Sequence, residues 1–174
     1  MELLNVYDEN NEFLNKKLDR EEIHDKGLWH HEVLIIVINE KKQVLLQKRS
    51  YKRRNLPGKW ALCAGHVISD ETEKKTAVRE LKEEIGLIIS AKDLKLIDIY
   101  KKNEPKNRKF SYIYLVKTTK KINEFKIQTN ELTQIKYVPI KKLIKMILDD
   151  DKHLVFGGDE YHLQLFTNIL HNTI

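Results

Sequence analysis

The feature that most constrains this chain is a glutamate-rich stretch, Gly65–Leu87, which reads GHVISDETEKKTAVRELKEEIGL. Helix-forming residues fill 71–85, and Gly86 follows at the place where a glycine commonly ends a helix. The stretch therefore predicts a helix over 71–85, with Ser69 or Asp70 as its N-terminal cap.

Three glutamates of this predicted helix, Glu80, Glu83 and Glu84, stand at positions i, i+3 and i+4. That spacing places their carboxylates on one side of the helix, where like charges repel. A divalent cation relieves the repulsion, and hard oxygen ligands suit Mg²⁺ or Mn²⁺, which also bind phosphate. A solvated amphipathic helix with i,i+4 pairs would explain the glutamates alone, so the wider pattern decides between the two interpretations.

The wider pattern resembles the Nudix box: Gly, five residues, Glu, seven residues, Arg-Glu, an apolar residue, any residue, Glu-Glu, any residue, Gly, and an apolar residue. Every specified place matches, and the places are held by Gly65, Glu71, Arg79, Glu80, Leu81, Glu83, Glu84, Gly86 and Leu87. Because seven of these places require one residue type, the resemblance is specific. It implies a loop–helix–loop that binds divalent metal around a diphosphate.

The resemblance also implies roles for individual residues. Glu83 and Glu84 would be metal ligands, and Glu80 would be a ligand or the general base that activates water. A backbone carbonyl at Ala64 or Gly65 would complete the metal shell. The implied cofactor is Mg²⁺ or Mn²⁺.

Two further residues of the box, Glu71 and Arg79, would form an ion pair that holds the loop against the helix. Members of this family also take their general base from outside the box, and Glu131 is a candidate for that role here.

Segments outside the box resemble the branch of the family related to isopentenyl-diphosphate isomerase: GLWHHEVLIIVIN, LLQKRS and the LPGKW…AGH run. In the isomerases, histidines before the first core strand and in a Gly-His pair bind a metal. His24, His30 and His66 stand at comparable places here. The resemblance thus leaves open whether these three histidines bind metal. His66, which lies in the box itself, is also a candidate for contact with the substrate.

Isomerases also need a reactive cysteine immediately before the Gly-His pair and an acidic pair on a later strand. Here Ala64 occupies the cysteine's place, and Cys63 is one residue too early, which turns a strand side chain to the other face. The later strand, around 108–112, has no acidic pair. These departures favour hydrolysis over isomerisation.

The predicted substrate is a small organic diphosphate, such as a nucleoside diphosphate linked to another group, with water attacking phosphorus. Arg49 is a candidate phosphate contact, because a guanidinium binds phosphate through two hydrogen bonds. Trp60 is a candidate for stacking on the substrate, or else packs in the protein. Besides the isomerase, a regulatory module that binds a diphosphate without turnover is an alternative, although such a module has no need of the complete box.

Composition supports a single domain, 1–174, with 41% apolar residues and one cysteine, too few for an internal disulfide. The acidic, polar N-terminus and the lack of a long apolar run predict a cytoplasmic protein without a membrane partner. The net charge of +6 is spread along the chain rather than interleaved with aromatic residues, which does not favour nucleic acid. A homodimer is expected only because homodimers are common.

The order of apolar runs and breaks predicts an α+β protein, a Nudix-like α/β/α sandwich with a mixed, mostly antiparallel sheet. Expected strands are 3–7, 33–38, 44–48, 94–100, 110–117 and 135–138, with an extended piece over 60–67. Expected helices, besides 71–85, run from Pro139 through Leu148 and over 159–170. The stretch 18–26 is expected to be a loop or short helix, and 101–109 a polar loop that contributes to substrate choice.

Overall fold

The structure, a computed structural model, describes residues 2–172 of the chain. These residues pack as two compact units. The first comprises the residues up to Ile35 together with 64–82 and 88–116, and the second comprises 36–63, 83–87 and the residues from Lys117 onwards. Strand β3 (His30–Asn39) and helix α2 (Glu73–Ile85) run through both units. The expectation of a single domain stays a prediction.

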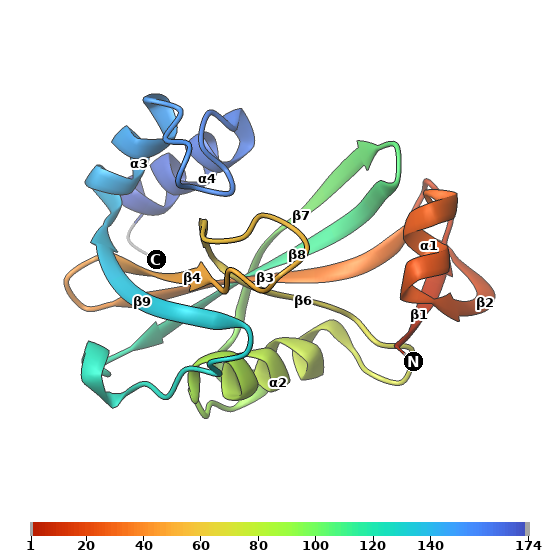
Figure 1. Ribbon diagram of the computed structural model, residues 1–174, viewed down its shortest axis with the longest axis horizontal. Coiled ribbons are helices and arrows are strands. Elements are labelled where there is room, and N and C mark those ends of the chain that lie inside the picture. The colour runs from red at the N-terminus through yellow and green to blue at the C-terminus, as the bar shows by residue number, and fades with distance from the viewer. Residues whose placement is uncertain (1, 173–174) are drawn as a thin grey trace. The chain divides into compact units, whose positions relative to one another are not determined.

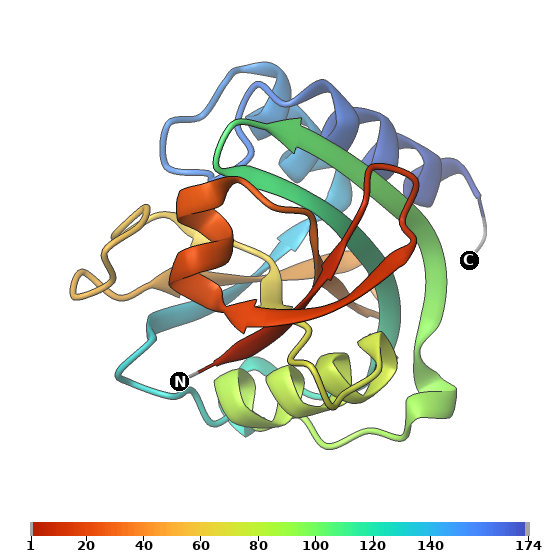
Figure 2. The same ribbon diagram turned by 90° about the vertical axis from the view of Figure 1, so that its right-hand side faces the viewer.

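The first unit begins with a two-stranded antiparallel ribbon, β1 (Leu3–Tyr7) and β2 (Phe13–Asp19), followed by helix α1 (Arg20–Lys26). Figure 2 shows the helix lying beside the ribbon. Leu4, Val6 and Ile23 form the shared core of these elements, because the alternation along β1 turns Leu4 and Val6 to the same face. Asp19 caps α1 by accepting a hydrogen bond from the backbone N–H of Glu21.

The same unit contains an antiparallel hairpin, β7 (Lys95–Glu104) and β8 (Asn107–Thr118), which begins after the short 3₁₀ helix η1 (Ala91–Asp93). The hairpin turns at Pro105–Lys106, where Lys106 has a φ of 63°. Buried side chains of β8, including Ile113 and Leu115, contribute to the core.

The second unit contains β4 (Gln43–Arg49), which pairs antiparallel with β5 (Trp60–Ala61) and with β9 (Leu132–Pro139). A 3₁₀ helix, η2 (Ile122–Glu124), precedes β9. Helices α3 (Ile140–Leu148) and α4 (Glu160–His171) follow, and Figure 1 shows them side by side beyond the end of β9. Their apolar faces bury Ile140, Leu143 and Phe166.

The main sheet has the strand order β5-β4-β3-β8-β7, and two more strands lie off this path. Strand β6 (Cys63–His66) pairs with β3, and β9 pairs with β4. The apolar run of β3 alternates little, as expected for a central strand buried on both faces: Val33, Ile35, Ile36 and Val37 are all buried.

One element was missed from the sequence, and two sequence-based expectations about elements were wrong. Strand β2 was not predicted, because its residues 13–17 are all exposed and lack a buried face. The expected polar loop over 101–109 is instead the end of β7, a tight turn and the start of β8. Helix α2 begins at Glu73, two residues later than expected, because the hydroxyl of Thr72, rather than Ser69 or Asp70, accepts a hydrogen bond from the first turn.

Among the described residues, none of the helices combines the length and the apolar character needed to cross a bilayer.

Candidate functional site

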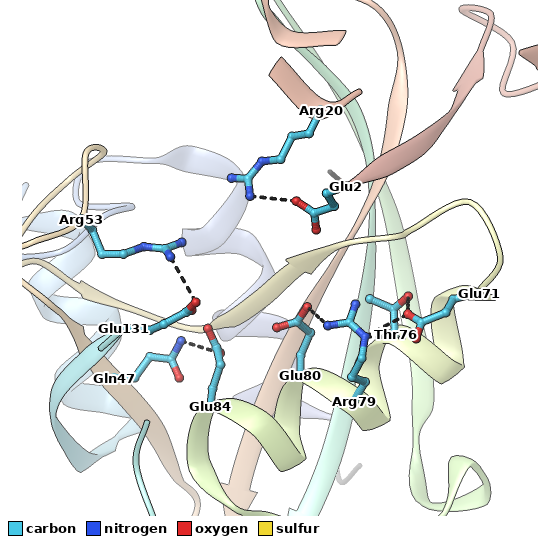
Figure 3. A network of polar contacts seen from close by, with 10 residues as sticks. All are labelled: Glu2, Arg20, Gln47, Arg53, Glu71, Thr76, Arg79, Glu80, Glu84 and Glu131. Carbon is cyan, nitrogen blue, oxygen red and sulfur yellow. Dashed lines mark hydrogen bonds and ion pairs between the residues drawn. The ribbon is translucent and has the colours of Figure 1, made fainter. Parts of the chain in front are cut away.

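Helix α2 carries a polar network in the first unit that is centred on Arg79 (Figure 3). The Nε of Arg79 donates to both carboxylate oxygens of Glu71, at 3.0 and 3.1 Å. Its Nη1 donates to Oε1 of Glu80 at 2.7 Å. The hydroxyl of Thr76, which is fully buried, donates to Glu71 Oε2 at 2.8 Å. One guanidinium thus fixes two carboxylates of the glutamate-rich stretch.

Burial would raise the pKa of Glu71, but the hydrogen bonds from Arg79 and Thr76 outweigh it, so the pKa of this carboxyl lies below its usual range. Glu71 is therefore ionised at neutral pH. Its charge and that of Arg79 hold the loop before α2 against the helix.

Gly65, in β6, lies against the side chain of Glu80. A methyl group built on Gly65 would lie 2.6 Å from Cγ of Glu80 and would overlap its carboxylate. Only glycine leaves that space, which is the physical reason for a glycine here. The backbone of Gly65 can therefore approach the Glu80 carboxylate closely.

Glu84 lies in the second unit in a different environment. It is 6% exposed, and its Oε2 accepts a hydrogen bond of 2.8 Å from Nε2 of Gln47, itself 5% exposed (Figure 3). Burial raises the pKa of Glu84, and hydrogen bonds from the Cys63 thiol and Gln47 offset part of that rise. Arg53 and Glu131 form an ion pair of 3.2 Å nearby. The negative charge of Glu131 raises the pKa of Glu84, and the positive charge of Arg53 lowers it.

The three glutamates predicted to bind metal differ in their surroundings. Glu83 is exposed, Glu80 is partly buried beside Arg79, and Glu84 is buried beside Gln47. Their oxygens suit Mg²⁺ or Mn²⁺, and a cation would relieve the cost of burying the Glu84 charge, so the donor set fits such an ion. These carboxylates are not the group of potential ligands that lies closest together in residues 2–172.

That group is a histidine cluster in the first unit, consisting of His24, His30 and His66, whose ligand nitrogens all lie within 4.8 Å of one another. Nδ1 of His24 lies 3.2 Å from the carbonyl oxygen of Lys106, and Nδ1 of His30 lies 3.1 Å from that of Leu28. A carbonyl only accepts, so Nδ1 carries a proton in both rings, and the second nitrogen of each ring, Nε2, faces the other members of the cluster.

Two members of the cluster, His30 and His66, lie in surroundings that favour the neutral imidazole. Nε2 of His24 lies 3.2 Å from Nε2 of His66, and the buried Nε2 of His30 has no hydrogen-bond partner in the described part of the chain. Burial lowers the pKa of His30 to about 4 and the pKa of His66 well below its usual value. His30 is thus a neutral imidazole whose tautomer is fixed by the carbonyl of Leu28, which is the form in which histidine binds metal.

Besides His66, the predicted substrate contacts are Arg49 and Trp60, and both make contacts within the second unit. Arg49 donates from Nε and Nη2 to the carbonyl oxygen of Asn55, at 3.1 and 2.9 Å, and so closes the loop that follows β4. Trp60 lies opposite Lys48 in the β4–β5 ladder, and Nζ of Lys136 lies 3.8 Å from its ring centroid. Because side chains alternate along a strand, Lys48 and Trp60 face away from Gln47.

Sequence reasoning missed Gln47, Thr76 and the role of Cys63. Thr76 could have been found, because it lies on the predicted helix within reach of Glu71. Cys63 is buried, at 4% exposure, and its contact with Glu84 was not foreseen. Gln47 and Glu84 are 37 residues apart, and no spacing rule connects them.

A family model described as NUDIX domain matches residues 28–156. The chain belongs to the Nudix family. Nudix hydrolase 3 of Arabidopsis thaliana is 31% identical over 142 residues, which cover 76% of this chain. The match spans only 18% of that longer protein. Family and relatives identify a Nudix-type hydrolase that acts on a diphosphate-containing substrate.

The isomerase branch is also represented among the Nudix relatives. An isopentenyl-diphosphate Delta-isomerase of Ruegeria pomeroyi is 37% identical over 71 residues, covering 40% of this chain and 39% of the isomerase. Among solved structures, DR0079 of Deinococcus radiodurans superposes with a TM-score of 0.73 at 18% identity, covering 96% of this chain and 98% of the other. This likeness confirms the α+β Nudix fold expected from the sequence.

Proposed function

We propose that this Nudix protein is a Mg²⁺- or Mn²⁺-dependent hydrolase of a small organic diphosphate, such as a nucleoside diphosphate linked to another group. The observation that carries the proposal is the Arg79 network. In this network Arg79 donates hydrogen bonds to both Glu71 and Glu80, and Gly65 packs against Glu80.

Each residue has a distinct part in the proposed reaction. Glu83 and Glu84 would hold the metal, which supplies positive charge to the diphosphate oxygens when bound. Glu80, kept in place by Arg79 at 2.7 Å, would bind metal or take the proton from the attacking water. The carbonyl of Gly65 would add an oxygen ligand. Arg79 and Glu71 keep this arrangement rigid rather than touch the substrate.

The contacts of Arg49 and Trp60 within the protein limit how these two residues could bind substrate. Since Arg49 already holds a backbone carbonyl with two donors, a phosphate would have to compete with Asn55 for it. Trp60 would contact substrate only on the face of the sheet that carries Lys48 of β4 and Lys136 of β9. A cytoplasmic location and a homodimer remain predictions.

The test is phosphate release from a panel of nucleotide, sugar-nucleotide, cofactor and isoprenoid diphosphates with Mg²⁺ or Mn²⁺, comparing wild type with Glu83→Gln. Glu104→Gln, at a residue whose side chain is 58% exposed in a surface ion pair, is the matched control. We expect metal-dependent turnover that Glu83→Gln abolishes and Glu104→Gln leaves intact. Turnover unaffected by Glu83→Gln, or no turnover with any diphosphate, would contradict the proposal; retained ligand binding in the second case indicates a regulatory module.

One observation favours a second candidate, an isomerase-like proton transfer. The ligand nitrogens of His24, His30 and His66 lie within 4.8 Å of one another, close enough to share one metal ion. The three histidines also stand at places comparable to those where the isomerases bind metal. Cys63 does not stand at the place of the isomerases' reactive cysteine, and its thiol contacts Glu84. Deuterium uptake from heavy water into isopentenyl diphosphate distinguishes the two candidates, because hydrolysis of the diphosphate places no deuterium on carbon.

A further inference from the structure

Two carboxylates on α2 are held in place by chemically different donors. Glu80 accepts a hydrogen bond from the cation Arg79, which compensates its charge. Glu84 accepts hydrogen bonds from the amide of Gln47 and the thiol of Cys63, both neutral. A neutral donor orients a carboxylate through a hydrogen bond without forming an ion pair with it.

The orientation of the Gln47 amide is fixed by its two acceptors. Nε2 donates to Glu84 Oε2 at 2.8 Å and points its other hydrogen toward the carbonyl oxygen of Leu62, at 3.4 Å. Because both neighbours only accept, the nitrogen rather than the oxygen of the amide must face Glu84. The 5% exposure of Gln47 leaves water little access to replace this donor.

The backbone explains why Gln47 reaches Glu84. In the paired strands, Gln47 lies opposite Ala61 on one side and Ile135 on the other, so β4 is fixed from both edges. Its neighbours Leu46 and Lys48 point to the opposite face of the sheet. The register of β4 therefore sets the position of the amide with no freedom to slide.

We propose that Gln47 is a positioning residue for metal binding: with Cys63 as a second donor, it holds the Glu84 carboxylate in the orientation that receives a divalent cation. This inference rests on the proposed function, in which Glu84 is a metal ligand. Gln47 touches neither metal nor substrate in this scheme. A purely structural role would affect the stability of the fold but not the affinity of the folded protein for metal.

The experiment measures the Kd for Mn²⁺ alone by electron paramagnetic resonance, and the Tm in parallel, for wild type, Gln47→Leu, Glu84→Gln and Gln134→Leu. Gln134 is an exposed glutamine on the adjacent strand β9 and is the matched control. We expect Gln47→Leu to weaken Mn²⁺ binding about 10- to 100-fold. Excess Mn²⁺ should restore turnover, because the amide acts on binding rather than on the chemical step. Gln134→Leu should bind as wild type does.

A second pair of variants keeps the inference testable should Gln47→Leu fail to fold. Cys63→Ser keeps a donor toward Glu84 and should retain Mn²⁺ affinity, whereas Cys63→Ala removes the donor and should weaken it. A lowered Tm with unchanged Mn²⁺ affinity in folded Gln47→Leu, or equal affinity in both Cys63 variants, would overturn the inference. If Glu84→Gln itself binds Mn²⁺ like wild type, the proposed metal site fails, which is a separate outcome.

Discussion

Replacing Gly65 by alanine should displace the Glu80 carboxylate. The added methyl would lie 2.6 Å from Cγ of Glu80 and overlap its carboxylate, so the side chain must rotate away from Arg79. The bond that is lost is a charge-assisted hydrogen bond of 2.7 Å between groups that are 26% and 13% exposed. Such a bond contributes about 2 kcal/mol. The Tm should therefore fall by roughly 4–8 °C for a protein of this size.

Activity should fall further than stability in the same variant. If Glu80 is the general base, its displacement should lower kcat/KM by about 10²- to 10⁴-fold. Urea denaturation and a phosphate-release assay at saturating metal measure the two effects separately. A Gly65→Ala protein with the stability and activity of wild type would show that the space beside Glu80 is not needed.

The matched control is a double-mutant cycle with Glu80→Ala. Shortening Glu80 removes the atoms that the new methyl would meet, so Gly65→Ala should cost almost nothing in the Glu80→Ala background. Additive losses in the double variant would mean that the methyl acts through some other neighbour, and the reasoning would be refuted.

Three further predictions concern stability. Thr76→Val removes the donor to Glu71 and should cost about 1 kcal/mol in urea denaturation, with equal stability contradicting the contact. Lys136→Met removes the ammonium from the Trp60 ring and should cost about 0.5–1 kcal/mol, whereas a stabilised variant would show that desolvation of the lysine outweighs the attraction. Burial lowers the pKa of His30 to about 4, so metal-free protein should lose about 3 kcal/mol as pH falls from about 6.5 to 4, because the unfolded chain takes up the proton first. A His30→Gln variant with an equally steep acid loss would refute that assignment.

The strands that have a buried face and the helices with clear end signals could be predicted from the sequence. The β3 run of apolar residues and the Pro139 boundary before α3 were both predicted. The sequence was not sufficient for β2, whose exposed residues carry no alternation, because that strand is defined by its pairing with β1. The ends of β7 and β8 were missed for the same reason, since polar residues in an exposed hairpin resemble a loop.

Some contacts of the candidate site could likewise be predicted, and others could not. The contact of Arg79 with Glu71 was expected from the resemblance to the Nudix box, whose pattern includes both residues. Contacts that depend on the register of a distant strand, such as that of Gln47 with Glu84, could not be predicted. The histidine cluster was expected only by resemblance, because its members come from α1, β3 and β6, and the fold alone brings their nitrogens together.

Strand β7 ends the order of the main sheet, and within residues 2–172 its ladder partner is β8. A ten-residue edge with exposed Leu96 and Ile99 could accept a strand from another chain and seed aggregation. Three lysines on β7, Lys95, Lys101 and Lys102, oppose such addition, because their charged groups would have to lose water against the incoming strand. Solubility at high concentration thus depends partly on side chains that take no part in the proposed chemistry.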